Sequence, residues 1–167
     1  FSNNGYQTTL LDSSDKVLNV AKTIFKKNNL DADYVVGNAL ALPFNNESFD
    51  IVFSIGLLEH FDEVLKPISE QIRVLNKGGI WFGYIVPEME NIVQKEFIWV
   101  NNILKTFQND KIYEVPKESV YRTSYKSKYY KEILENLNVK NINASGIYSV
   151  PMISHSIDFP FTLMNEK

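Results

Sequence analysis

The side chain best suited to chemistry near the start of this chain is Asp12, which follows the run Thr8-Thr9-Leu10-Leu11. A carboxylate only accepts hydrogen bonds and has two oxygens, so it can bind both hydroxyls of a nucleoside ribose from the end of a strand. Asp is also favoured at the start of a helix, where it caps the first turn. The residues alone therefore predict either a ribose ligand or a helix cap at Asp12.

A second group of candidates lies between Gly37 and His60. Gly37-Asn38-Ala39 is either a binding loop or a plain turn, because Asn after Gly is common in turns. Gly56 permits a close backbone approach or an unusual dihedral angle, or it only turns the chain. His60 has an unperturbed pKa near neutrality, which suits a general base, although packing is the simpler role. Glu59 beside it reads as no more than an acid at a helix start.

Alternating strand and helix patterns must position these residues. We predict strands over 6–11, 33–36, 50–55 and 80–86. Helices with apolar stripes separate them, and the residues expected on the buried faces are Val17, Val20, Ala21, Ile24 and Phe25 in the first and Val64, Leu65, Ile68, Ile72 and Leu75 in the second. This alternation indicates right-handed βαβ units and a parallel sheet, in which ligands bind at the carboxyl ends of the strands. The nearly continuous apolar run 50–55 predicts a strand covered on both faces.

The ends of these elements carry further signals. Ser13 and Ser14 are N-cap candidates for the first helix, and Pro67 must lie in the first turn of the second. Gly78-Gly79 would end that helix as a left-handed C-cap. A later helix over about 128–137 would be followed by a strand over 139–147.

Motifs in this frame resemble those of the class I S-adenosylmethionine-dependent methyltransferases, particularly the small-molecule branch. They are Leu42-Pro43-Phe44, Ser48-Phe49-Asp50, Leu58-Glu59-His60-Phe61 and the turn sequence 73–79, in which Lys77 replaces the family's proline. The resemblance covers 6–86 well and 127–147 loosely. It implies a Rossmann-like α/β fold: a doubly wound, mostly parallel sheet with helices on both faces, as one domain over residues 1–167. Segment 88–119, with the aromatic residues Phe97, Trp99 and Phe107, would be a helical insertion or lid over the acceptor, or core packing.

The resemblance also assigns a cofactor and its ligands. S-adenosylmethionine would bind with its ribose at Asp12 and Ser13, its adenine at Asn38, Ala39 and Leu40, and its methionine part beside Ser54, Ile55 and Gly56. Asn38 replaces the family's usual aspartate, and its amide oxygen accepts a hydrogen bond without charge assistance. His60 is a weak candidate for catalysis. With two histidines and no cysteine, we expect no metal site.

One expected motif does not precede Asp12. The family's glycine-rich loop after its first strand should lie there, and the chain has only Gly5 before Asp12. That strand lies centrally in the family's sheet. We therefore expect an N-terminally incomplete fold, in which two groups of strands lack their shared neighbour.

Composition limits the functional classes. Lys plus Arg total 17 against 20 Asp plus Glu, and this net charge of −3 argues against a general nucleic-acid binder. Lys126, Lys128 and Lys131 form either a basic patch or a solvated helix face. No apolar run has the length of a membrane span, no signal peptide is visible, and the absence of cysteine fits a cytoplasmic protein.

These observations favour methyl transfer from S-adenosylmethionine to a small-molecule acceptor, with no nucleic-acid or membrane partner. The alternative from another class is a non-catalytic, methyltransferase-like binding or scaffold domain, which Asn38 and the missing glycine loop favour. A nucleotide-dependent dehydrogenase would share the ribose acid. The Leu-Pro-Phe, Phe-Asp-Ile-Val and Glu-His-Phe sequences argue against it.

Overall fold

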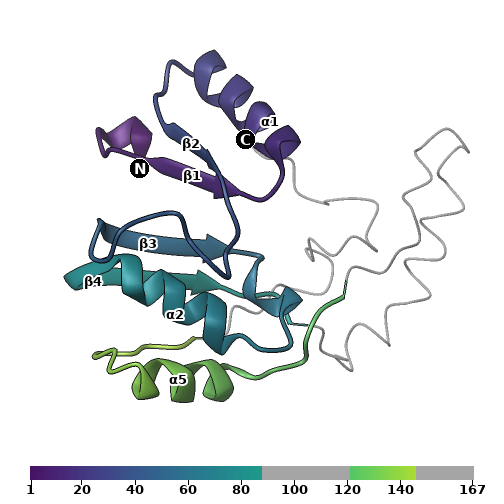
Figure 1. The fold of residues 1–167 in the computed structure, drawn as a ribbon, viewed down its shortest axis with the longest axis vertical. Helices are drawn as coiled ribbons and strands as arrows, with labels where there is room; N and C mark the ends of the chain where they lie inside the picture. The colour runs from purple at the N-terminus through teal and green to yellow at the C-terminus, as the bar shows by residue number, and fades with distance from the viewer. Residues whose placement is uncertain (88–120, 146–167) are drawn as a thin grey trace, which may run out of the picture. The chain divides into compact units, whose positions relative to one another are not determined.

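The computed structural model describes residues 1–87 and 121–145 (Figure 1). The chain divides into two compact units, Phe1–Ile85 and Val86–Lys167, and each is described by itself. The predicted insertion 88–119, His155 and the chain's last residues lie outside the described ranges. No helix among the described residues is long and apolar enough to cross a membrane.

The first unit begins with a parallel strand pair. A 3-10 turn, η1 (Ser2–Asn4), leads to β1 (Thr9–Asp12), which pairs in parallel with β2 (Asp33–Val36) from Thr9↔Asp33 to Asp12↔Val36. The helix between them is α1 (Asp15–Lys27). Its N-cap is Ser14, whose side chain accepts the Val17 N–H at 3.4 Å. The predicted strand 33–36 and the predicted serine cap are both confirmed.

The buried face of α1 is narrower than its sequence predicts. Leu18 is buried, whereas Val17, Val20 and Ile24 are 51%, 60% and 54% exposed. The prediction that these three side chains face the core is wrong. The sheet beneath α1 has only two strands, so it covers only part of the helix's apolar stripe.

A second parallel pair completes the first unit. β3 (Phe49–Ile55) pairs with β4 (Leu75–Tyr84), and the connection runs through the 3-10 turn η2 (Leu58–His60) and α2 (Leu65–Val74). Pro67 lies in the first turn of α2, as predicted. The residues that α2 buries are Pro67, Ile68, Gln71 and Val74, together with the N-cap Val64. Leu65 is 52% exposed, so its assignment to the buried face is wrong.

Gly78-Gly79 forms a bulge in β4 and does not cap α2. The helix ends at Val74, and Leu75 is already extended. Phe49 pairs with Leu75 but Ile51 pairs with Ile80, so β4 carries extra residues at this point. Gly78 has φ +80°, and a Cβ on Gly79 would lie 2.8 Å from the Asp50 carbonyl oxygen. The predicted C-cap is therefore wrong, because both glycines serve the strand.

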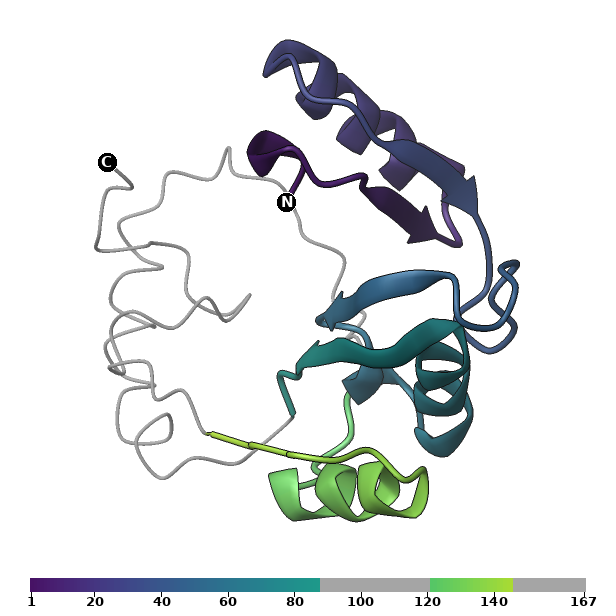
Figure 2. The ribbon, with the colours of Figure 1, turned by 90° about the vertical axis from the view of Figure 1, so that its left-hand side faces the viewer.

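Parallel pairs with intervening helices confirm the predicted Rossmann-like α/β class. The two pairs are separate two-stranded sheets, β1-β2 and β3-β4, as expected for strands that lack a shared neighbour (Figure 2). The predicted cover on both faces of β3 is wrong, since Phe53 and Ile55 are 41% and 63% exposed. α2 packs on this sheet, and no second helix of the described residues makes comparable contact with it. The ring of Phe1 stacks on Phe53 at 5.2 Å.

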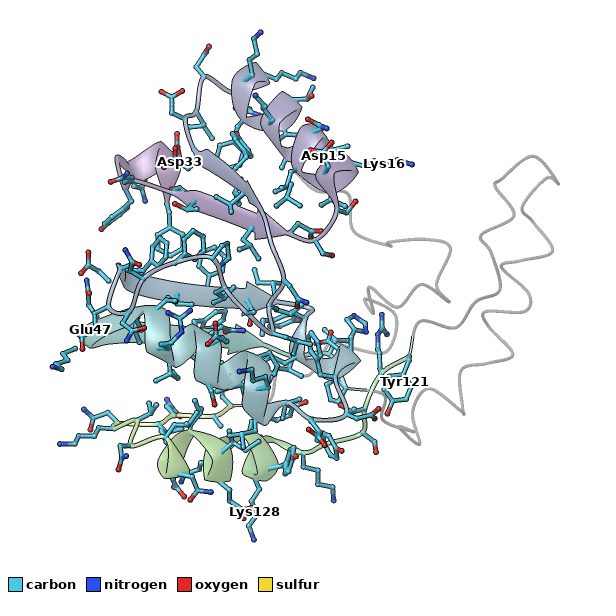
Figure 3. All side chains as sticks on the ribbon, viewed as in Figure 1. Asp15, Lys16, Asp33, Glu47, Tyr121 and Lys128 are labelled. Carbon is cyan, nitrogen blue, oxygen red and sulfur yellow. The ribbon has the colours of Figure 1, made fainter. Side chains whose placement is uncertain are left out.

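The described part of the second unit contains α5 (Ser127–Asn136), which buries Tyr130, Ile133 and Leu134. Lys128 pairs with Glu132 at 3.7 Å and points outward from the helix (Figure 3). The exposed lysines of α5 form a solvated helix face. The strand predicted over 139–147 is absent from residues 139–145, where Asn141 has φ +56° and interrupts an extended backbone.

Candidate functional site

Asp12 ends β1 and belongs to two local networks. Its Oδ1 accepts the Ser14 N–H at 2.7 Å, and its main-chain carbonyl accepts the Gly37 N–H at 3.0 Å. Ser14 caps α1, so Asp12 is not the N-cap that the alternative prediction proposed. Within residues 1–87, the second carboxylate oxygen of Asp12 forms no hydrogen bond. Asp12 therefore lies beside the loop that follows β2, with an acceptor left for a ligand.

Gly37 allows that loop to approach β1 closely. A Cβ on Gly37 would lie 2.8 Å from Leu11 Cδ1 and 3.1 Å from Pro43 Cδ, so a larger residue would have to displace the Leu11 side chain and press on the Pro43 ring. The carboxyl ends of β1 and β2 meet here because their register pairs Asp12 with Val36. Parallel pairing thus brings Asp12, at the end of β1, beside the loop that begins at Gly37.

The residues after Gly37 form a tight turn. The Ala41 N–H donates to the Asn38 carbonyl at 3.0 Å, and the Leu40 N–H donates to Asn38 Oδ1 at 2.8 Å. The Asn38 side chain thus stabilises its own turn, as Asn often does. The Ala39 N–H donates to no acceptor in the described part of the chain. It is a main-chain donor that could serve a ligand.

The turn is also held at its far end, where Leu42 contacts α2. The Leu42 N–H donates to Glu70 Oε2 at 2.8 Å, and its carbonyl accepts from Arg73 Nη2 at 3.0 Å. Sequence reasoning assigned no chemistry to these two side chains. Their i,i+3 spacing on a helix predicts that they pair with each other, but it does not predict their contact with Leu42, 28 residues before Glu70.

At the carboxyl end of β3, the Ser54 side chain is engaged with α2. Ser54 is 8% exposed, and its hydroxyl donates to Gln71 Oε1 at 3.4 Å. The same amide oxygen accepts the Trp81 Nε1–H at 2.7 Å. A ligand at Ser54 would therefore contact its backbone, and Gln71 is a buried polar residue that sequence reasoning missed.

Ile55 ends β3, and Gly56 turns the chain out of the sheet. Ile55 is 63% exposed, and the Gly56 N–H donates to the Tyr84 carbonyl at 2.9 Å. Gly56 has φ +62°, while a Cβ there would meet only Glu59 Oε1 at 3.7 Å. Its left-handed backbone, and not crowding, requires glycine, which matches the unusual dihedral angle that the sequence suggested.

Glu59 is the unexpected polar residue of η2. It is 1% exposed, and its Oε2 has no hydrogen-bond partner. Glu59 lies in the first turn of η2, as the sequence predicted, and its burial is the property that this prediction did not include. Its position between Leu58 and His60-Phe61 is the sequence signal for burial. His60 is half-buried and closes η2 through its N–H to the Leu57 carbonyl at 3.2 Å.

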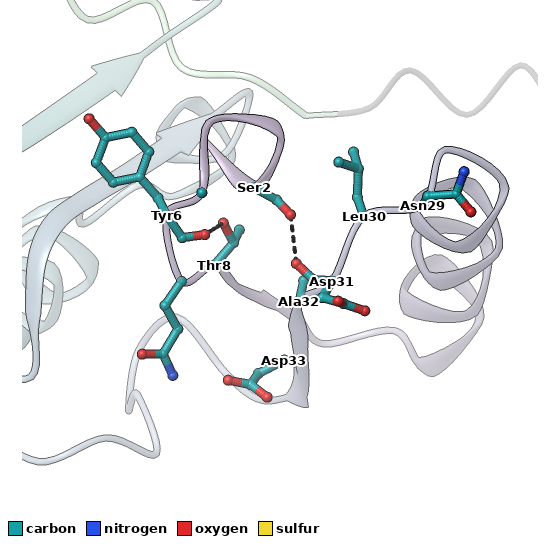
Figure 4. A pocket seen from close by; sticks show the side chains of 10 residues that line it. Ser2, Tyr6, Thr8, Asn29, Leu30, Asp31, Ala32 and Asp33 are labelled. Atoms are coloured by element: carbon teal, nitrogen blue, oxygen red, sulfur yellow. Dashed lines mark hydrogen bonds between the residues drawn. The ribbon is translucent and has the colours of Figure 1, made fainter.

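The structure thus places Asp12 beside Gly37, the residue that precedes the 38–40 turn. It places Ser54, Ile55 and Gly56 on the other sheet, which shares no strand pairing with β1. A separate pocket lies at the amino ends of β1 and β2, lined by Ser2, Gly5, Tyr6, Gln7, Thr8 and 29–33 (Figure 4). Ser2 Oγ donates there to the Asp31 carbonyl at 2.7 Å. This pocket is at the opposite end of the strands from Asp12 and contains none of the predicted ligands.

Comparison with known proteins relates part of this chain to a family. The model of the methyltransferase domain family matches residues 1–83, which include both sheets and the Asp12, Asn38 and Gly56 segments.

Curated relatives also match part of the chain. The ubiquinone/menaquinone biosynthesis C-methyltransferase of Bartonella tribocorum is 36% identical over 100 residues, which are 57% of this chain and 35% of that protein. The ubiquinone biosynthesis O-methyltransferase of Pelagibacter ubique is 35% identical over 72 residues, or 43% of this chain and 30% of that protein. The chain thus spans about a third of the length of the curated relatives it matches.

Solved structures show the fold. The BH2331 protein of Bacillus halodurans has a TM-score of 0.58 at 24% identity, over 78% of this chain and 52% of that one. The YcgJ protein of Bacillus subtilis has a TM-score of 0.56 at 23% identity, over 78% of this chain and 51% of that one.

Proposed function

We propose that this chain, whose residues 1–83 match the methyltransferase domain family, acts as a class I S-adenosylmethionine-dependent methyltransferase that transfers a methyl group to a small-molecule acceptor. The observation that carries the proposal is the hydrogen bond from the Gly37 N–H to the Asp12 carbonyl. It holds a ribose-type carboxylate beside a turn with an available main-chain donor.

These residues fit the nucleoside part of S-adenosylmethionine. The second oxygen of Asp12 can accept a ribose hydroxyl, and the Ala39 N–H can donate to an adenine nitrogen. Asn38 Oδ1 already accepts one hydrogen bond, and its second lone pair can accept another. Ser13 follows Asp12 in the same turn, and Leu40 lies in the turn with Asn38, so both remain predicted contacts.

The backbone of Ser54, Ile55 and Gly56 would lie beside the methionine part. When bound, S-adenosylmethionine supplies an activated sulfonium methyl group. The chain's own residues then need only hold donor and acceptor in line, because orientation alone lowers the barrier by several kcal/mol, on the order of 7–11 in favourable cases. No strong base is required, and His60 stays a weak candidate for proton transfer.

The names of the curated relatives support a narrower acceptor class. They include ubiquinone/menaquinone C-methyltransferases and the demethylmenaquinone methyltransferase of Lactococcus lactis, which is 39% identical over 71 residues. We therefore propose a quinone precursor as the acceptor.

The second candidate function is a non-catalytic, methyltransferase-like binding domain. The observation that favours it is the Leu40 N–H bond to Asn38 Oδ1, which reduces what that side chain offers to adenine. A turnover assay separates the two. Incubation with S-adenosylmethionine and reduced demethylmenaquinone should form S-adenosylhomocysteine and methylated product. Binding of S-adenosylmethionine without product, for this and other phenolic acceptors, would support the non-catalytic domain.

A further inference from the structure

Glu70 and Arg73 of α2 form a bidentate salt bridge. Arg73 Nε donates to Glu70 Oε1 at 2.8 Å, and Arg73 Nη2 donates to Glu70 Oε2 at 2.8 Å. Two parallel N–H···O bonds fix the relative orientation of the two side chains as well as their distance. A lysine at position 73 could not reproduce this geometry, because its ammonium group is a single point of charge.

The remaining donors of Arg73 all reach the segment after the candidate adenine turn. Nη1 donates to the Phe44 carbonyl at 2.8 Å and to Asn46 Oδ1 at 2.9 Å, and Nη2 donates to the Leu42 carbonyl at 3.0 Å. A guanidinium group has five N–H donors, so the donor capacity of Arg73 is fully used. Glu70 completes the contact by accepting the Leu42 N–H.

The candidate adenine turn is therefore anchored at both ends. Its first end is tied to β1 through Gly37 and Asp12, and its second end is tied to α2 through both main-chain groups of Leu42. Only residues 38–41 lie between these anchors. The position of the Ala39 N–H thus depends directly on where α2 holds Leu42.

The pair stays charged across the physiological range. The Arg73 hydrogen bonds hold the pKa of the Glu70 carboxyl at about 2, with help from the Leu42 N–H and against the effect of burial. The two side chains are 13% and 30% exposed, so water competes only partly for these bonds. Other α2 side chains hold the core: Ile68 and Val74 are buried, and Gln71 contacts Ser54 and Trp81.

We propose that Glu70 and Arg73 are positioning residues for nucleoside binding: they set the 38–41 turn so that it can receive the adenine of the ligand. This inference rests on the proposed function. It predicts that affinity for adenosine-containing ligands depends on the pair more than stability does, and that acceptor binding does not depend on it.

The test compares Arg73→Lys and Glu70→Gln with two control variants. Lys77→Ala removes a neighbouring exposed ion pair, Lys77–Glu47 at 3.4 Å, which holds no part of the turn. Val74→Ala creates a small cavity in the face of α2 that packs on the core, and so lowers stability without touching the turn. Dissociation constants for S-adenosylhomocysteine and adenosine, thermal melting and amide exchange would be measured for each folded variant.

We expect Arg73→Lys and Glu70→Gln to raise the dissociation constants of both ligands by about tenfold or more. This is roughly the effect of losing one bidentate contact. The amides of Leu40 and Leu42 should exchange faster. Both control variants should bind as the wild type does, including Val74→Ala with its lower melting temperature.

Two results would overturn the inference in distinguishable ways. If the wild type binds and the two pair variants bind equally well while folded, the positioning role is wrong and the proposed function stands. If the wild type binds neither ligand, the proposed function fails and the inference with it. Should Arg73→Lys not fold, Asn46→Ala removes one contact of the network and should still weaken binding by about two- to threefold.

Discussion

At the residue scale, Asp12 serves folding with one carboxylate oxygen and leaves the other for a ligand. Oδ1 holds the Ser14 N–H at the start of α1, a role that any side-chain oxygen at this position can fill. A ribose with two hydroxyl donors needs a pure acceptor, and only the carboxylate supplies that. The two roles can be separated, because asparagine retains the first and impairs the second.

We predict that Asp12→Asn leaves the free energy of unfolding within about 0.5 kcal/mol of wild type, whereas Asp12→Ala lowers it by about 1 kcal/mol. Both variants should bind S-adenosylhomocysteine at least about tenfold more weakly than wild type, because each loses the charged acceptor. Urea unfolding and calorimetry measure the two effects. Wild-type affinity in a folded Asp12→Asn variant would identify Asp12 as a structural residue only.

The lowered pKa of Glu70 predicts how the stability of the chain changes at acidic pH. Its pKa is lowered from 4.5 to about 2 in the folded chain, so its ionised form contributes stability that is complete above the unfolded pKa and is lost as the pH falls toward 2. The difference in urea midpoint between wild type and Glu70→Gln should therefore be constant from pH 7 to about pH 5 and shrink below that. A difference that persists unchanged to pH 2 would show that the carboxylate charge has no part in it.

At the element scale, the turn from α2 into β4 depends on two glycines for different reasons. Gly78 has φ +80° with open space around it, while Gly79 would place a Cβ 2.8 Å from the Asp50 carbonyl oxygen and 2.9 Å from that of Asn76. Backbone oxygens cannot move aside as the end of a flexible side chain can. A side chain should therefore be tolerated better at Gly78, where it would strain the backbone, than at Gly79, where it would clash with backbone oxygens.

Gly79→Ala should accordingly lower the free energy of unfolding by more than about 2 kcal/mol, and Gly78→Ala by about 1 kcal/mol. Chemical denaturation of the two single variants gives the comparison. A larger loss for Gly78→Ala would mean that the bulge geometry is wrong.

Local signals in the sequence predicted the elements well where one element alone decides the outcome. The Ser14 cap, the strand 33–36 and the first-turn Pro67 depend on neighbouring residues, and all three are confirmed. The exposed stripe of Val17 and Ile24 depends on how many strands lie beneath α1, which no local pattern contains.

The same distinction applies to the candidate site, where some features follow from local sequence patterns and others from tertiary contacts. Because parallel strands bring their carboxyl ends together, the approach of Asp12 to the Gly37 loop followed from element order. The partners of Ser54 and Arg73 did not. Each depends on which face of a helix or turn meets which loop, and long-range side-chain contacts such as Ser54 to Gln71 have no signature in spacing.

At the scale of the whole molecule, the described first unit is two strand pairs with one predicted ligand group on each. Asp12 and the 38–40 turn lie on the first pair, and the Ser54–Gly56 backbone lies on the second. The predicted nucleoside contacts therefore all belong to the first strand pair and the turn that follows it. We predict that adenosine retains most of the affinity of S-adenosylhomocysteine for this chain, and that methionine alone does not compete. Competition titration measures this, and displacement by methionine but not by adenosine would place the binding site elsewhere.

The most direct test of the central claim is calorimetric titration of the intact chain with S-adenosylhomocysteine, with Asp12→Asn as the matched variant. The account predicts saturable binding of one ligand per chain, weakened at least about tenfold in the variant. No heat with the folded wild type at ligand concentrations up to millimolar would contradict it.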